Sequence, residues 1–249
     1  MADFVLVHGA WHGAWCWRDV IASLGAAGHR AHAVTLTGVG ERAHLLRPGI
    51  GLQDHILDVI AAIEAEEMQD LVLVVHSYAG MVGTGVADRL GERIAHLVYV
   101  DAVVPRPGES WGSTHTRATR EGRLAAAQAS PTFSFPPPGA SLFGLSGDQE
   151  AWVNRRQTPH PAQPYLDELH FSIDTLAAIP RTFISCTQPT LATIDAIRVR
   201  VTDPQFWGGR WRPLSRVIEM ATGHDPMVSD PQGLTRILLG CVPAEEAPQ

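Results

Sequence analysis

A serine directly after a run of apolar residues is the first candidate for chemistry in this chain. Ser77 follows the apolar run 71–75 after a single residue, and a helix is predicted over 79–90. A sharp turn from a buried strand into a helix exposes a serine hydroxyl as a nucleophile, and it favours glycine two positions before and after the serine. Val75 and Ala79 stand there instead, so the pattern is matched imperfectly. Ser77 could also be a helix N-cap, a common place for serine, but the strand–serine–helix order favours a nucleophile.

His224 is the histidine best placed to activate this serine. A serine hydroxyl is a weak nucleophile near neutral pH, and it needs a histidine base that an acid holds in position. His224 follows the predicted strand 217–220, in a loop that can reach back over the strand ends to Ser77. The order of serine first and histidine last is also the order that this kind of nucleophile turn uses. His76, beside the serine, is expected to point away and pack.

The acid partner is less well determined, and two aspartates compete for the role. The predicted strand 182–185 is followed by residues 186–190, which contain no carboxylate, and the next acid is Asp195. Asp101 directly follows the predicted strand 94–100, at the carboxyl edge of the sheet where catalytic groups gather. We favour Asp101 and keep Asp195 as the alternative. A purely structural role for Asp101, as a cap of a loop or helix, stays open.

The loop after the first apolar run supplies a candidate oxyanion hole. Residues 8–15 read HGAWHGAW, and a loop with glycine lets backbone N–H groups face a substrate carbonyl oxygen. The N–H groups of Ala10 and of Tyr78, the residue after the nucleophile, are predicted to be the donors. Trp11 is a candidate for lining the substrate pocket, with core packing as the alternative.

The elements that must position these residues alternate along the chain. Such alternation predicts an α/β fold with a doubly wound, mostly parallel sheet. The expected strands are 4–7, 30–36, 71–75, 94–100, 182–185 and 217–220, and the expected helices are 17–27, 52–67, 79–90 and 234–239.

The stretch 106–180 breaks this alternation and is predicted to be a cap inserted over the carboxyl edge of the sheet. It contains three consecutive prolines (136–138), several separate aromatic residues and two helix-like pieces, 117–128 and 148–155. An interdomain linker is the alternative, but a solvated linker would contain fewer aromatic residues. The core would then consist of residues 1–105 and 181–249.

Composition limits the classes of partner. The chain has 249 residues, of which 45% are hydrophobic, with a net charge of −7 and no basic stripe, which argues against nucleic-acid binding. No signal peptide and no apolar run of about 18 residues is visible, so a cytoplasmic protein without membrane contact is expected. Cys16, Cys186 and Cys241 form no metal or redox motif. The oligomeric state stays open, a homodimer included.

Five segments together resemble a known family. The sequence resembles the α/β-hydrolase branch of plant methyl esterases and hydroxynitrile lyases. The segments that carry this resemblance are 5–11 (VLVHGAW), 36–42 (LTGVGER), the Ser77 turn, 98–105 (VYVDAVVP) and 222–225 (TGHD). The likeness is nearer to bacterial esterases of the salicylate-esterase and pyrethroid-hydrolase type, and it is weakest across 106–180. The resemblance implies catalysis by Ser77 and His224 without cofactor or metal, and a helical cap over an apolar pocket.

The chain departs from that family at two places. The plant members have their acid in the loop that corresponds to 186–190, where this chain has none, and this supports a shift of the acid to Asp101. The lyases need a lysine after the histidine and a threonine in the first loop, where this chain has Asp225 and Gly9. A carboxylate cannot stabilise departing cyanide, so a lyase is disfavoured. Asp225 is also badly placed to orient His224.

These observations predict a serine hydrolase that cleaves a small-to-medium hydrophobic carboxylic ester through an acyl-enzyme at Ser77. A lyase, thioesterase or cyclase of natural-product metabolism on the same scaffold is one alternative, because a fold does not fix its chemistry. A binding protein for a small apolar ligand, without catalysis, is the other. Such a protein has no need to keep a serine, a histidine and a glycine-containing loop together.

Overall fold

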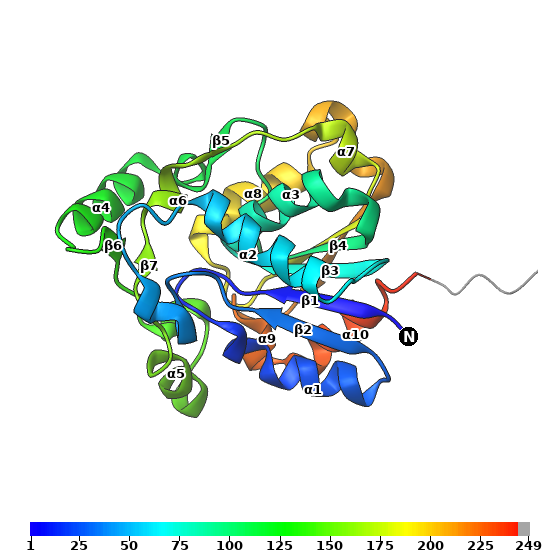
Figure 1. Ribbon diagram of the computed structural model, residues 1–249, viewed down its shortest axis with the longest axis horizontal. Coiled ribbons are helices and arrows are strands. Elements are labelled where there is room, and N and C mark those ends of the chain that lie inside the picture. Colours follow the sequence, from blue (N-terminus) through cyan, green and yellow to red (C-terminus); the bar gives the residue numbers. More distant parts are fainter. Residues whose placement is uncertain (244–249) are drawn as a thin grey trace, which may run out of the picture.

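The computed structural model describes residues 1–243 and contains a six-stranded sheet at its centre (Figure 1). All five strand pairings are parallel, in the spatial order β10-β9-β4-β3-β1-β2. This confirms the predicted α/β class. The strands are β1 (Asp3–Val7), β2 (Arg30–Val34), β3 (Leu71–His76), β4 (Ile94–Val100), β9 (Arg181–Cys186) and β10 (Ser215–Met220).

Helices cover both faces of this sheet, which explains why all six residues of β3 are buried. Figure 1 shows one group of helices below the sheet and another above it. The lower group is α1 (Arg18–Ala26), α9 (Pro226–Ser229) and α10 (Pro231–Leu239), and the upper group is α2 (Leu52–Ala65), α3 (Ala79–Leu90) and α8 (Asp195–Thr202). Short 3-10 helices occur at Ala14–Trp17, Gly40–Leu45, Gly91–Arg93, Trp111–Thr114, Ala140–Phe143, Ala192–Ile194, Phe206–Gly209 and Arg212–Leu214.

Residues 106–180 contribute no strand to the six-stranded sheet. They form two small antiparallel sheets and several short helices, and in Figure 1 α4, β6 and β7 lie beyond the end of β1. The chain contacts the first loop there, since the N–H of Thr158 donates to the carbonyl of Trp11 at 3.0 Å. The elements are β5 (Glu109–Ser110), α4 (Arg117–Gln128), β6 (Ser134–Phe135), α5 (Gly147–Asn154), β7 (His160–Pro161), α6 (Gln163–Leu166), β8 (Glu168–Leu169) and α7 (Ile173–Ala177).

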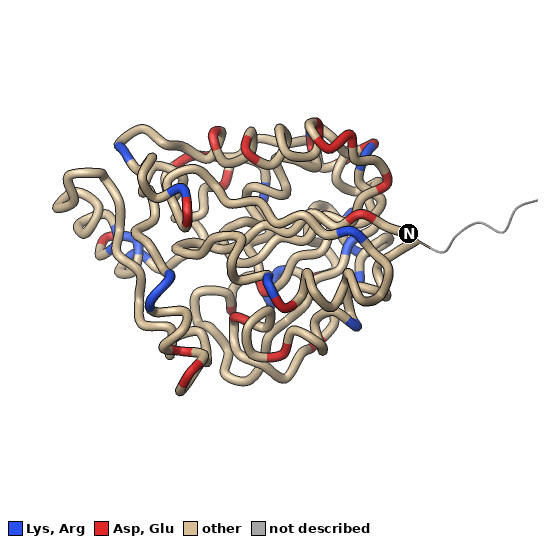
Figure 2. The backbone as a smooth tube through the Cα atoms, turned by 60° about the horizontal axis from the view of Figure 1, so that its bottom comes forward, with Lys and Arg blue, Asp and Glu red and all other residues tan. Residues whose placement is uncertain are grey.

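Charged residues of both signs are interspersed along the chain (Figure 2). Within residues 1–243, no helix combines the length and the apolar character that crossing a bilayer requires.

Candidate active site

Ser77 occupies a strained backbone position between β3 and α3. Its φ angle is 55°, in the left-handed region that residues other than glycine rarely adopt. The turn is held from both sides, because the Ser77 N–H donates to the Val100 carbonyl at 3.2 Å and the Ser77 carbonyl accepts from the Val103 N–H at 2.9 Å. A side chain at Gly80 would place its Cβ 1.9 Å from the Val103 carbonyl oxygen. This turn therefore needs glycine three residues after the serine.

The imperfect match to the glycine pattern has a local explanation. The side chain of Val75, where the pattern has glycine, lies over Gly83 of α3, and a Cβ at Gly83 would come within 2.4 Å of Val75 Cγ1. A glycine one helical turn further along therefore provides the space that the missing glycine would have left. The sequence pattern alone does not show that Gly83 makes room for Val75, because the two residues belong to different elements.

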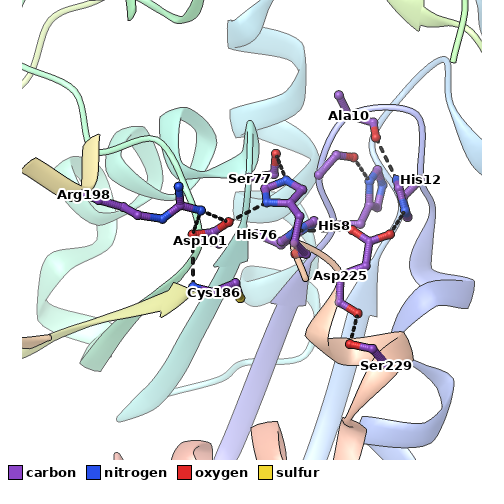
Figure 3. A network of polar contacts seen from close by, with 12 residues as sticks. His8, Ala10, His12, His76, Ser77, Asp101, Cys186, Arg198, Asp225 and Ser229 are labelled. Carbon is purple, nitrogen blue, oxygen red and sulfur yellow. Dashed lines mark hydrogen bonds and ion pairs between the residues drawn. The ribbon is translucent and has the colours of Figure 1, made fainter. Parts of the chain in front are cut away.

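His224 connects the serine to a buried carboxylate, and these two partners, Ser77 and Asp101, are labelled in Figure 3. Its Nε2 atom lies 2.8 Å from Ser77 Oγ, and its Nδ1 atom lies 2.7 Å from Asp101 Oδ2. The carboxylate accepts the Nδ1–H, so the lone pair of Nε2 faces the serine hydroxyl and can accept its proton. His76 lies beneath this ring, with centroids 4.6 Å apart, and its Nε2–H donates to the His224 carbonyl at 2.9 Å.

The structure brings Asp101, and not Asp195, to His224. Asp101 is fully buried at the end of β4, and both of its oxygens lie 2.8 Å from Nη2 of Arg198 on α8. The N–H of Cys186 also donates to Asp101 Oδ1, at 3.3 Å. Asp195 is 57% exposed and pairs with Nη1 of the same Arg198 at 2.6 Å. The last residue of β9, Cys186, thus supplies a backbone donor to Asp101.

The loop after β1 passes directly beside Ser77. A Cβ at Gly9 would lie 2.8 Å from the Cβ of Ser77, so only glycine allows this approach. Among residues 1–243, neither the N–H of Ala10 nor the N–H of Tyr78 donates to a protein acceptor. Two free donors beside a serine hydroxyl match the arrangement expected of an oxyanion hole.

Two buried histidines fix the peptide planes of this loop. His8 Nδ1–H donates to the Gly9 carbonyl at 2.7 Å, while its Nε2 accepts from the Leu36 N–H at 3.1 Å. A trans peptide points its N–H opposite to its carbonyl, so this bond sets the direction of the Ala10 N–H. His12 Nδ1–H donates to the next carbonyl, that of Ala10, at 2.8 Å.

Beside Ser77 and His224 a cavity of about 240 Å³ opens under residues 106–180. Trp11 lines it and is also packed among aromatic rings, with its ring centroid 6.2 Å from Phe143 and 6.4 Å from Trp111. The two alternatives for Trp11, pocket lining and core packing, therefore describe two faces of one side chain. The lining is Trp11, Ser77, Trp111, His115, Arg123, Leu142, Phe143, Thr190, Leu191, Ala192, Thr193, Ile194 and His224.

Comparison with known proteins assigns the chain to a family over nearly its whole length. Residues 4–237 match the model of the alpha/beta hydrolase family. The chain belongs to this family. The resemblance found in the short motifs is thereby confirmed over nearly the full length of the hydrolase.

Relatives of the hydrolase include named esterases. It is 41% identical over 246 residues to the carbendazim hydrolyzing esterase of Nocardioides sp. (strain SG-4G), covering 96% of this chain and 98% of that protein. It is 29% identical over 254 residues to methylesterase 7 of Arabidopsis thaliana, covering 95% of this chain and 94% of the relative. The hydrolase is accordingly an enzyme of the carboxylesterase type.

Solved structures share its fold. An extracellular alpha/beta-hydrolase from a Paenibacillus species matches with a TM-score of 0.82 at 20% identity, covering 98% of this chain and all of that one. A pyrethroid hydrolase matches with a TM-score of 0.70 at 20% identity, covering 98% of this chain and 99% of the other. Both likenesses confirm the predicted fold.

Asp225, beside His224 in the sequence, has a partner of its own in the hydrolase. Its Oδ2 lies 3.0 Å from His12 Nε2, and both side chains are buried. Burial alone would lower the pKa of His12, but the Asp225 carboxylate and the two hydrogen bonds outweigh it and raise this pKa. Burial would likewise raise the pKa of Asp225, but the positive charge and hydrogen bond of His12 lower it. His12 donates from both ring nitrogens, so the pair is an imidazolium and a carboxylate.

Replacing His12 with alanine is expected to lower the free energy of unfolding by about 3–5 kcal/mol, because the buried Asp225 carboxylate loses its countercharge. The double variant His12→Ala/Asp225→Ala contains neither charge and should lose less than the sum of the two single variants. Urea unfolding of the four proteins measures this coupling. Additive losses would show that the two side chains do not act as an ion pair.

Six other histidines of the hydrolase are held neutral, mainly by burial. Burial lowers the pKa of His8 to about 3, of His115 to about 3 and of His96 to about 4. It also lowers the pKa of the remaining three, His55, His76 and His160. In an unfolded chain the pKa of histidine is about 6.5. Below that pH the unfolded chain binds more protons than the folded one, so acid destabilises the fold.

The free energy of unfolding is therefore expected to fall by about 3 kcal/mol or more between pH 7 and pH 5. His12 acts in the opposite sense, because its raised pKa adds stability below about pH 6.5 that is lost as the pH rises, but it is one group against six. Urea midpoints at several pH values measure the fall. A His96→Gln variant, whose change lies away from Ser77, should show a smaller fall of the urea midpoint between pH 7 and pH 5. A urea midpoint that does not change with pH would contradict the assignment of neutral histidines.

Three side chains of the site had no clear signal in the sequence: Arg198, His12 and Asp225. Arg198 lies on α8, 97 positions from the aspartate that it binds. His12 and Asp225 are separated by 213 positions. The spacing of the HGAWHG motif, with its second histidine four residues after the first, was the one available pointer to His12.

Proposed function

We propose that the hydrolase cleaves a hydrophobic carboxylic ester through an acyl-enzyme on Ser77, with His224 as general base and Asp101 as the acid of a catalytic triad. The observation that supports this most directly is the continuous chain of hydrogen bonds from Asp101 through His224 to Ser77, 2.7 Å and 2.8 Å long, beside the cavity. The esterases among the relatives support the same reaction class.

The first half of the reaction forms the acyl-enzyme. His224 Nε2 takes the proton of the Ser77 hydroxyl while Oγ attacks the ester carbonyl carbon, and the carbonyl electrons move onto oxygen. The tetrahedral intermediate collapses, the bond to the alcohol oxygen breaks, and His224 gives its proton to the departing alcohol. In the second half, water takes the place of the serine hydroxyl and releases the acid.

The negative oxygen of each tetrahedral intermediate would accept from the N–H groups of Ala10 and Tyr78. Loss of one such donor typically costs about 3 kcal/mol of transition-state stabilisation. In the hydrolase the His8 bond to the Gly9 carbonyl and the His12 bond to the Ala10 carbonyl prepare the loop before substrate binds. These donors therefore need little reorganisation during the reaction.

The cavity favours a small or medium substrate with an aromatic or aliphatic group. Tryptophan, phenylalanine and leucine side chains account for much of its lining, and its volume of about 240 Å³ limits the ligand to modest size. The lyase alternative is not supported, because the residue after His224 is Asp225, a carboxylate buried against His12, and not the lysine that the lyase resemblance requires.

Hydrolysis of p-nitrophenyl acetate, butyrate and benzoate by the purified hydrolase tests the proposal. We expect turnover of at least one ester well above the rate in buffer. A folded enzyme that releases no p-nitrophenol from any of the three, at any pH between 6 and 9, would contradict the proposed reaction.

A further inference from the structure

One cationic side chain lines the cavity without an acidic partner. Arg123, on α4, faces the cavity that contains Ser77 and also an adjoining hollow beside the prolines 136–138. Its guanidinium donates no hydrogen bond and forms no ion pair with any residue between 1 and 243, and its Nη1 atom is buried without a partner. None of the described residues that line the cavity is acidic.

Four aromatic rings surround this guanidinium. Its Cζ atom lies 5.0 Å from the ring of Trp111, 5.3 Å from Tyr165, 5.4 Å from Trp11 and 5.7 Å from Phe135. Burial lowers the pKa of Arg123, but a guanidinium stays protonated near neutral pH. Ring faces attract the cation without accepting its five N–H donors in the plane of the fork. The rings therefore hold the Arg123 guanidinium in place, while its N–H donors stay free to bind an acceptor on a ligand.

His115, the titratable residue beside Arg123 in the cavity lining, does not accept the hydrogen bonds of this guanidinium. Burial, with a smaller contribution from Arg123, lowers the pKa of His115 to about 3, so its ring is neutral near pH 7. Its Nδ1 atom is engaged with the Tyr165 hydroxyl at 2.8 Å. Among the described lining residues, Arg123 is thus the one with a fixed charge facing the ligand space.

Arg123 and Ser77 line the same cavity of about 240 Å³, so one small ligand can lie between them. The rings of Trp11 and Trp111 line this cavity as well, 5.4 Å and 5.0 Å from Arg123 Cζ, and form an aromatic wall. A ligand with its ester carbon at Ser77 and one ring along this aromatic wall would place the far substituent of that ring near the guanidinium. A planar guanidinium binds a carboxylate with two parallel hydrogen bonds.

We propose that Arg123 determines the specificity of the hydrolase by binding a carboxylate at the end of the substrate remote from the scissile ester. The preferred substrates would then be half-esters of aromatic dicarboxylic acids, and not neutral esters of the same shape. This inference rests on the proposed esterase function and adds the substrate class.

Two esters of matched shape test the inference: monomethyl terephthalate, which carries a carboxylate, and methyl 4-methylbenzoate, which is neutral. The quantity to measure is the ratio of kcat/KM for the anionic ester to kcat/KM for the neutral one. Arg123→Met should lower this ratio by about 10- to 100-fold, the usual effect of losing a charged hydrogen bond. Arg120→Met removes the same charge from the exposed side of α4 and should leave the ratio unchanged.

A ratio that is the same in the wild type and in Arg123→Met would overturn the inference. Should that variant fail to fold, Arg123→Gln makes the same comparison, because it keeps an amide N–H among the rings and removes the charge. Binding separates this inference from the esterase proposal. Calorimetry should show monomethyl terephthalate binding to Ser77→Ala at least about 10-fold more tightly than to Ser77→Ala/Arg123→Met. If the wild type hydrolyses neither methyl ester, this binding comparison alone decides the role of Arg123, while the p-nitrophenyl esters decide the esterase proposal.

Discussion

Replacing Ser77 with alanine is expected to lower kcat for p-nitrophenyl esters by about 10⁵- to 10⁶-fold, as loss of a serine nucleophile does in enzymes of this mechanism. The variant should keep its fold, because alanine and serine tolerate a φ of 55° about equally and Ser77 Oγ contacts His224 alone among the described side chains. Steady-state rates measured beside circular dichroism and the urea midpoint separate lost chemistry from lost structure.

A nearby serine provides the matched control for this variant. Ser229 lies on α9, where its hydroxyl donates to the Asp225 carbonyl at 3.1 Å (Figure 3). Among the described residues, no hydrogen bond joins this hydroxyl to His224. Ser229→Ala should therefore retain most of the wild-type rate. Undiminished turnover by folded Ser77→Ala would show that another residue attacks the ester.

Changing Asp101 to asparagine is expected to lower kcat by about 10⁴-fold. The asparagine amide donates where the carboxylate accepts, which favours the His224 tautomer with its proton on Nε2, so that nitrogen can no longer take the proton of Ser77. The change also removes the negative charge that both the imidazolium and Arg198 require, since both Asp101 oxygens lie 2.8 Å from Arg198 Nη2.

Asp195→Asn is the matched control, because Asp195 binds the other nitrogen of the same arginine and is exposed. We expect its kcat to stay within about threefold of the wild type, in line with the small energies of exposed ion pairs. Both rates are measured with the same ester at saturating concentration. An inactive, folded Asp195→Asn beside an active Asp101→Asn would assign the acid to Asp195.

The sequence was sufficient to predict the sheet and the neighbourhood of the nucleophile. Buried parallel strands such as 71–75 and 94–100 are short, continuous apolar runs, and their carboxyl ends meet at one edge. Ser77 and Asp101 each follow such a strand, and His224 follows the parallel edge strand β10, so their proximity follows from topology. The observed strands start and end within two residues of the predicted ones.

The choice between Asp101 and Asp195 depended on contacts that no local pattern contains. Asp101 has a backbone φ of 43°, in the left-handed region. Its carboxylate oxygens accept from Arg198 and from the Cys186 N–H, which belong to elements distant in sequence. Asp195 differs because it begins α8 and faces solvent. The sequence around Asp195 is compatible with a helix, but a stretch of eight residues does not reveal which side of that helix is exposed.

Within the predicted cap, 106–180, the sequence indicated a helix but not the chemistry of its side chains. The helix predicted over 117–128 coincides with α4, but nothing in its sequence distinguishes Arg123, which faces the cavity, from the exposed Arg117 and Arg120. The aromatic rings that surround Arg123 come from the first loop and from three separate segments of 106–180. Such a cluster appears only when the chain is folded.

Covalent labelling tests most directly that Ser77 is the nucleophile. The hydrolase is incubated with a fluorophosphonate, digested and mapped by peptide mass spectrometry, with His224→Ala treated in parallel. We expect one phosphonate adduct on Ser77 of the wild type, with loss of ester hydrolysis in step with labelling, and labelling slower by orders of magnitude in His224→Ala. An adduct on another residue that tracks the loss of activity, or full activity of protein labelled at Ser77, would show that Ser77 is not the nucleophile.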